Sequence, residues 1–211
     1  MTQTHPIPPP LRRPIRLAVL LSGSGTTLEN LYTAIADGRL PAALAVVLAS
    51  TPAAYGLERA RRHGTPAVCV ERKAFGSWRD HAAAVWAALE PFAFDAVVLA
   101  GYMCRITVPS GLRGKILNVH PALLPAFGGK GMYGHHVHAA VLAAGARETG
   151  CTVHVVDEQY DHGPVLAQAR VAVEAGDTAD TLAARVQAAE RALYPQVIGE
   201  YLGKELGLEV Q

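Results

Sequence analysis

The first strong constraint on the fold is a short apolar run that ends in a glycine-rich loop. The run, Ile15–Leu21, stops at the segment 22–25, a pattern typical of a strand buried on both faces. Apolar residues then recur at helical spacing from Leu28 to Ile35, and Gly38 follows as a helix stop. The chain therefore opens with a predicted strand, loop and helix.

The same alternation continues along the chain. Further strands are predicted at 44–49, 67–70, 96–100 and 116–119, with helices at 57–63 and 78–89. The last third adds predicted strands at 151–156 and 164–173 and a closing helix at 178–202. Because each parallel crossover needs a covering helix, the sequence predicts a Rossmann-like α/β fold with a mostly parallel central sheet and helices on both faces.

Composition indicates one folded unit that begins after a short tail. Half of the 211 residues are hydrophobic and 18% are charged, which is enough apolar material for one buried sheet. Residues 1–13 are rich in proline and polar side chains instead. We therefore expect a disordered proline-rich tail at 1–13 and a single domain at 14–211.

Charge and cysteine content indicate which classes of partner and which cellular compartment suit the chain. The formal net charge of +1 gives no field that would hold nucleic acid. The three cysteines stand far apart in the sequence, which disfavours both a disulfide framework and a thiolate zinc site. No membrane span or targeting signal is visible. We expect a cytoplasmic protein that binds small molecules, as a monomer or a homodimer.

The loop after the first strand is a candidate phosphate site. Free backbone N–H groups and the positive end of a helix dipole attract an anion there, and glycines let the backbone come close. Leu28 stands where a dinucleotide fingerprint has its third glycine, so a single phosphate is the better hypothesis. The alternative is a tight turn whose serine and threonine side chains only cap the helix.

Polar side chains at a strand end form the strongest candidate catalytic group. Asn118 and His120 are two residues apart, so they face the same side of the strand. An imidazole can donate to an oxyanion or move a proton near neutral pH, and a carboxamide adds a donor. Asp161, in the turn between the last two strands, could support the imidazole if those strands extend the sheet. The competing interpretation is that all three only satisfy backbone groups or shape a turn.

Four segments taken together resemble one family. They are Ser-Gly-Ser-Gly-Thr at 22–26, Leu-Ala-Gly-Tyr-Met at 99–103, Asn-Val-His-Pro-Ala-Leu-Leu-Pro at 118–125 and Asp-His-Gly-Pro at 161–164. In order and spacing the chain resembles the folate-dependent formyltransferases, and among these the glycinamide ribonucleotide formyltransferases. The resemblance implies a purine-biosynthesis enzyme that moves the formyl group of 10-formyltetrahydrofolate to the amine of glycinamide ribonucleotide, with no metal.

The resemblance also assigns roles to residues. It implies that Asn118, His120 and Asp161 are catalytic. The implied substrate-binding residues are Gly23, Ser24, Gly25, Thr26, Thr27, Arg79, Gly101 and Glu190. The implied folate-binding residues are Tyr102, Met103, Cys104, Arg105, Ile106, Asn118, Val156 and Asp157. For Glu190 the competing interpretation is a solvated helix face.

One segment departs from the common family pattern. Residues 130–134 and the following His135, His136 and His138 replace a more usual Pro-Gly-x-His loop. Adjacent histidines on a forming helix seldom converge on one ion, which disfavours a metal site. We interpret the segment as a substrate-proximal loop.

Three other functions share part of this pattern. Methionyl-tRNA formyltransferase and formyltetrahydrofolate hydrolase carry further domains that we do not expect here, and near-neutral charge disfavours tRNA binding. A catalytically silent nucleotide-binding module of the same fold is the alternative from another class, because fold alone does not establish function. The sequence therefore favours the transferase.

Overall fold

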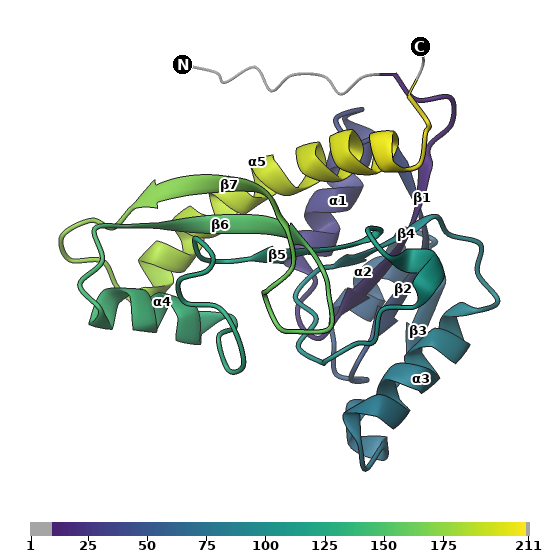
Figure 1. Ribbon diagram of the computed structural model, residues 1–211, viewed down its shortest axis with the longest axis horizontal. Coiled ribbons are helices and arrows are strands. Elements are labelled where there is room, and N and C mark those ends of the chain that lie inside the picture. Colours follow the sequence, from purple (N-terminus) through teal and green to yellow (C-terminus); the bar gives the residue numbers. More distant parts are fainter. Residues whose placement is uncertain (1–9, 210–211) are drawn as a thin grey trace.

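A seven-stranded sheet forms the centre of the computed structural model, which describes residues 10–209 (Figure 1). The strand order is β3-β2-β1-β4-β5-β6-β7. The first five strands run parallel, and β6 and β7 pair antiparallel, which confirms the mostly parallel sheet. The strands are β1 Ile15–Leu21, β2 Ala42–Ala49, β3 Ala67–Cys69, β4 Ala96–Leu99, β5 Ile116–His120, β6 Glu148–Val155 and β7 Val165–Ala172.

Five α-helices surround the sheet within the described residues. They are α1 Thr26–Ala36, α2 Gly56–Arg62, α3 Trp78–Leu89, α4 His135–Ala143 and α5 Ala179–Glu205. Four of these helices begin within two residues of their predicted positions, whereas α4 occupies a segment interpreted as a loop. No helix among residues 10–209 is long and apolar enough to cross a membrane.

The sheet separates two hydrophobic cores, which explains why β1 is apolar on both faces. Leu17, Val19 and Leu21 belong to the core that includes α1 and α5. Ala18 and Leu20 belong to the other core, with α3. Helices therefore cover both faces of the sheet, as predicted.

Helix α5 is tied to the centre of the sheet by one buried tyrosine. The Tyr194 hydroxyl donates to the carbonyl oxygens of Leu99 and Leu117, at 3.1 and 3.0 Å. Leu99 is the last residue of β4, and Leu117 lies within β5. A buried hydroxyl with backbone partners fixes the helix against the strands that carry the candidate site.

Residues just before β1, which fall within the predicted tail, contact the rest of the fold. Leu11 forms an isolated bridge with Glu209 and lies against Gly203 of α5. Arg13 forms an ion pair with Asp95 at 2.6 Å. An apolar contact and a charge-assisted hydrogen bond thus hold this segment to the fold. Residues 1–9 lie outside the described residues, so the tail prediction stays a prediction for them.

Candidate active site

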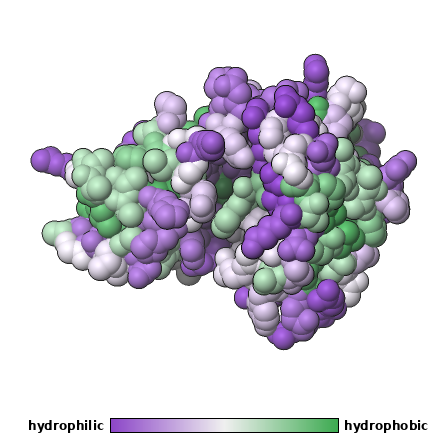
Figure 2. Space-filling model, turned by 90° about the horizontal axis from the view of Figure 1, so that it is seen from below, coloured by the Kyte–Doolittle hydropathy of each residue, from purple (hydrophilic) through white to green (hydrophobic). Residues whose placement is uncertain are grey.

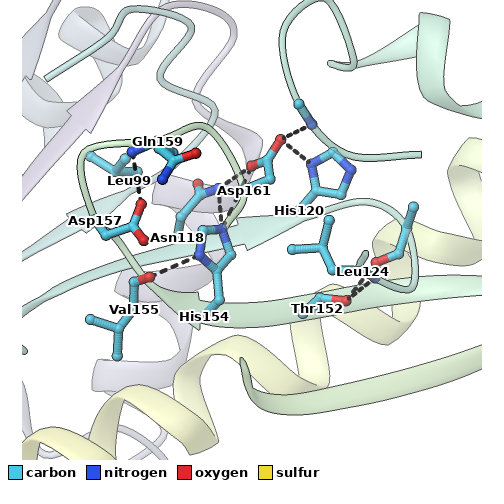
Figure 3. A network of polar contacts seen from close by, with 12 residues as sticks. Leu99, Asn118, His120, Leu124, Thr152, His154, Val155, Asp157, Gln159 and Asp161 are labelled. Carbon is cyan, nitrogen blue, oxygen red and sulfur yellow. Dashed lines mark hydrogen bonds and ion pairs between the residues drawn. The ribbon is translucent and has the colours of Figure 1, made fainter. Parts of the chain in front are cut away.

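The three predicted catalytic side chains meet at the carboxyl end of β5 (Figure 3). Asn118 and His120 belong to β5, and Asp161 comes from the loop between β6 and β7. Atom Nδ1 of His120 lies 3.5 Å from Oδ2 of Asp161. The Asn118 amide donates to Oδ1 of the same carboxylate, also at 3.5 Å. One carboxylate thus contacts both strand residues.

A fourth polar residue, which the sequence did not single out, completes the group. His154 of β6 lies opposite Asn118 in the antiparallel register. Its Nδ1 lies 3.0 Å from the Val155 carbonyl oxygen, and its Nε2 lies 3.1 Å from the Asn118 amide nitrogen and 3.6 Å from Oδ1 of Asp161. His154 therefore orients the amide of Asn118. In the sequence, Thr152 and His154 stand at alternate positions, which is the signal that they share one face of the strand. The sequence does not show which strand residue pairs with His154.

Burial and neighbouring charge set the protonation of this group. Burial lowers the pKa of His120, although Asp161 and the Phe127 carbonyl act in the opposite direction. Burial opposes the ionised form of Asp161, but its contacts with His154, His120 and Gly129 together hold its pKa below the ordinary value. Near neutral pH the pair therefore consists of a carboxylate beside a neutral imidazole.

The catalytic group lies on the wall of a cleft of about 730 Å³. Figure 2 shows a hollow in this face, between the part that carries α4 and the part that carries α3. The predicted residues that line the cleft are Thr26, Thr27, Gly101, Tyr102, Met103, Cys104, Arg105, Ile106, Asn118, His120, Val156, Asp157, Asp161 and Glu190. Gly23, Ser24, Gly25 and Arg79 are not among the lining residues.

In the candidate phosphate loop, a glycine and not a capping side chain precedes the first turn of α1. Gly25 is the N-cap of α1, in the left-handed region with φ of 74°, and no side chain at that position accepts a helix N–H. A Cβ on Gly25 would lie 2.7 Å from the Cα of Gly56. The alternative of a serine or threonine N-cap is therefore wrong, because glycine alone fits this turn. The first residues of α1, Thr26 and Thr27, line the cleft.

Glu190 faces the same end of the cleft from α5. It is half-buried, and the Thr27 hydroxyl donates to its Oε1 at 3.4 Å. Burial raises the pKa of Glu190 to about 7, with Thr27 acting weakly in the opposite direction. A solvated helix face is thus the wrong description of this residue. The carboxylate can accept hydrogen bonds from a ligand that lies beside the start of α1.

The loop after β4 forms another wall of the cleft. Gly101 adopts a left-handed φ of 74°, and the Met103 N–H donates to the Ser22 hydroxyl at 2.9 Å. Burial raises the pKa of the Tyr102 phenol well above its usual range, so the phenol stays neutral. Arg105 donates to the Glu158 carbonyl at 2.7 Å, which joins this loop to the one that carries Asp161.

Comparison with known proteins agrees with this arrangement. The family model described as formyl transferase matches residues 15–198. The chain belongs to the formyl transferase family. It is 42% identical over 188 residues to "Phosphoribosylglycinamide formyltransferase, chloroplastic" of Arabidopsis thaliana, covering 87% of this chain and 64% of that protein. It is 39% identical over 186 residues to "Trifunctional purine biosynthetic protein adenosine-3" of Gallus gallus, covering 87% of this chain and 18% of that protein.

A solved structure is similar over most of both chains. Glycinamide ribonucleotide transformylase 1 from Symbiobacterium toebii superposes with a TM-score of 0.84 at 39% identity, covering 90% of this chain and 89% of that one. This confirms the Rossmann-like formyltransferase fold. The chain nevertheless spans less than two thirds of the length of the two curated relatives above.

Arg79 is a predicted substrate-binding residue that does not line the cleft. It is exposed at the start of α3, and its guanidinium lies 4.7 Å from the centroid of the Trp78 ring. Arg105, which does line the cleft, approaches the same ring to 4.3 Å. The intervening tryptophan therefore separates Arg79 from the residues around the cleft.

The histidine-rich segment begins a helix instead of continuing a loop. His135 and His138 line the cleft from α4, together with residues 129–134 before it. His138 is buried, and burial lowers its pKa. Within residues 10–209 no group of three or more His, Cys, Asp or Glu side chains is arranged to hold a metal ion.

Proposed function

We propose that this formyl transferase moves the formyl group of 10-formyltetrahydrofolate to the amine of glycinamide ribonucleotide. The products are formylglycinamide ribonucleotide and tetrahydrofolate. The observation that carries the proposal is the contact of Asp161 with both Asn118 and His120, within 3.5 Å, on a cleft wall. The names of the relatives and of the similar structure support it.

The amide of Asn118 suits the first step. The substrate amine attacks the formyl carbon, a carbon–nitrogen bond forms, and the formyl oxygen becomes an oxyanion. The Asn118 contact with Asp161 is at the limit of hydrogen-bond length, so that N–H can donate to the oxyanion instead with little loss. His154 keeps the other N–H, which holds the amide plane in place.

The His120 and Asp161 pair suits the proton transfers. Collapse of the intermediate breaks the bond from the formyl carbon to N10 of the folate, and the net change moves one proton from the amine to N10. A neutral imidazole beside a carboxylate can accept the amine proton and pass it on. The lowered pKa of His120 and of Asp161 provides that starting state at neutral pH.

The ends of the cleft suit the two substrates. The N–H groups at the start of α1 would bind the ribonucleotide phosphate, and Glu190 would accept from the ribose hydroxyls. The loop 101–106, with Val156 and Asp157, would enclose the folate. The free cysteines of the described chain favour a cytoplasmic location, and monomer or homodimer stays a prediction.

The test measures tetrahydrofolate formed from 10-formyltetrahydrofolate, with and without glycinamide ribonucleotide. Product that depends on the ribonucleotide supports the proposal. Product without it identifies a hydrolase, and binding of both ligands without product identifies a silent module. Asp161→Asn should lose at least about a hundredfold in kcat. Asp37→Asn, at an exposed residue, is the matched control and should keep wild-type kcat.

A further inference from the structure

A short backbone segment, 127–129, contacts both titratable members of the catalytic group. His120 donates from Nε2 to the Phe127 carbonyl at 2.8 Å. The Gly129 N–H donates to Oδ2 of Asp161 at 2.9 Å. His120 comes from β5, and Asp161 comes from the loop after β6. The segment therefore joins two groups that different parts of the chain supply.

The segment adopts a conformation that its sequence disfavours. Phe127 has a φ of 55°, in the left-handed region that residues other than glycine rarely occupy. Gly128 has no room for a side chain, since a Cβ would lie 2.6 Å from Cδ2 of Leu124 and 3.3 Å from Cβ of Asp161. The left-handed turn and the missing side chain bring the Phe127 carbonyl and the Gly129 N–H to the two catalytic groups.

The hydrogen bond to Phe127 determines which ring nitrogen of His120 exchanges a proton. A carbonyl oxygen only accepts, so Nε2 carries the hydrogen in the neutral ring. The lone pair of Nδ1 then faces Oδ2 of Asp161 at 3.5 Å. A proton taken up by the ring enters at Nδ1, between imidazole and carboxylate. Other titratable groups near the ring are His154 of β6 and His138 of α4.

We propose that the segment 127–129 is a positioning element of the catalytic centre. Its Phe127 carbonyl selects the Nε2-protonated form of neutral His120, and its Gly129 N–H holds the Asp161 carboxylate opposite Nδ1. The inference rests on the proposed function in one respect, namely that His120 and Asp161 move protons during formyl transfer. The choice of ring nitrogen itself does not depend on the reaction.

The test compares Gly128→Ala with Gly111→Ala, a glycine of ordinary φ at which an added Cβ would meet no atom within 4 Å. Two-bond nitrogen–proton NMR of the histidine rings reports which nitrogen carries the hydrogen. Wild type and Gly111→Ala should show the Nε2–H form of neutral His120. Gly128→Ala should lose that preference and lose about tenfold to a hundredfold in kcat, with a shifted pH profile and little change in KM.

Two substitutions at Phe127 keep the test valid if Gly128→Ala does not fold. Phe127→Gly fits the left-handed turn without strain, so it should keep the Nε2–H form of neutral His120. Phe127→Val is unfavourable there and should resemble Gly128→Ala. The Nδ1–H form in the wild type would overturn the proposal, as would wild-type kcat and pH profile in Gly128→Ala. The Nε2–H form without any formyl transfer would instead support the positioning and refute the proposed function.

Discussion

Replacing Glu190 with glutamine separates the effect of this carboxylate on stability from its proposed role in binding. Burial raises its pKa from 4.5 to about 7. Between these values the folded chain binds more protons at this site than the unfolded chain, so its contribution to stability falls as the pH rises. At about 1.4 kcal/mol for each pKa unit, the ionised side chain opposes folding by at most about 3.5 kcal/mol at pH 8.

Glutamine removes this pH-dependent term because it stays neutral. Since the side chain is only half-buried, we expect Glu190→Gln to raise the free energy of unfolding by about 1–3 kcal/mol at pH 8. The gain should shrink to less than about 1 kcal/mol at pH 5, where the folded carboxyl is protonated. Urea unfolding followed by tryptophan fluorescence at both pH values measures it. The same variant should raise KM for the ribonucleotide with little change in kcat.

The matched control is Glu200→Gln, at an exposed position of the same helix. It should change the free energy of unfolding by less than about 0.5 kcal/mol at either pH. Equal gains for Glu190→Gln at pH 5 and pH 8, or a loss at pH 8, would refute the reasoning from burial.

Three further predictions concern stability. Gly25→Ala should lower the free energy of unfolding in urea by about 1–3 kcal/mol and raise KM for the ribonucleotide, because φ at Gly25 is left-handed and Gly56 is too close. The control Gly76→Ala, where an added Cβ meets no atom, should leave the free energy of unfolding unchanged. Tyr194→Phe should lower the free energy of unfolding in urea by about 1–2 kcal/mol, since it removes the buried hydrogen bonds between α5 and the sheet. An unchanged urea midpoint would contradict this. Buried histidines with lowered pKa are His81, His120 and His138. Below about pH 6.5 the unfolded chain binds more protons at these sites than the folded chain. The free energy of unfolding should therefore be highest above that pH and should fall toward pH 5, measured in the Glu190→Gln variant. A free energy that does not change with pH would argue against buried neutral rings.

The sequence predicted the elements whose signal is local. β1 begins and ends where its apolar run does, because both of its faces are buried. α3 likewise matches its predicted span, since Ser77 caps its first turn. By contrast, the start of α4 was interpreted as a loop, although Val137, His138 and Val141 share a buried face at helical spacing.

The site residues that belong to a single strand could be predicted from the sequence. Those that reach the site only through the pairing of strands or the packing of helices could not. Asn118 and His120 share a face because alternate residues of a strand always do. The contribution of His154 depends on the antiparallel register of β5 and β6, which the path of the chain between them decides. The same holds for Arg79, whose distance from the cleft follows from how α3 and Trp78 are placed.

The pairing of Leu11 with Glu209 has a consequence for how this fold can be built into larger proteins. Both residues lie at the end of the sheet where the parallel strand β1 begins, whereas the cleft lies at the opposite end, where the parallel strands stop. A polypeptide that enters and leaves at this one place attaches neighbouring modules behind the catalytic face. A larger protein that contained this fold could therefore attach further modules there without covering the cleft.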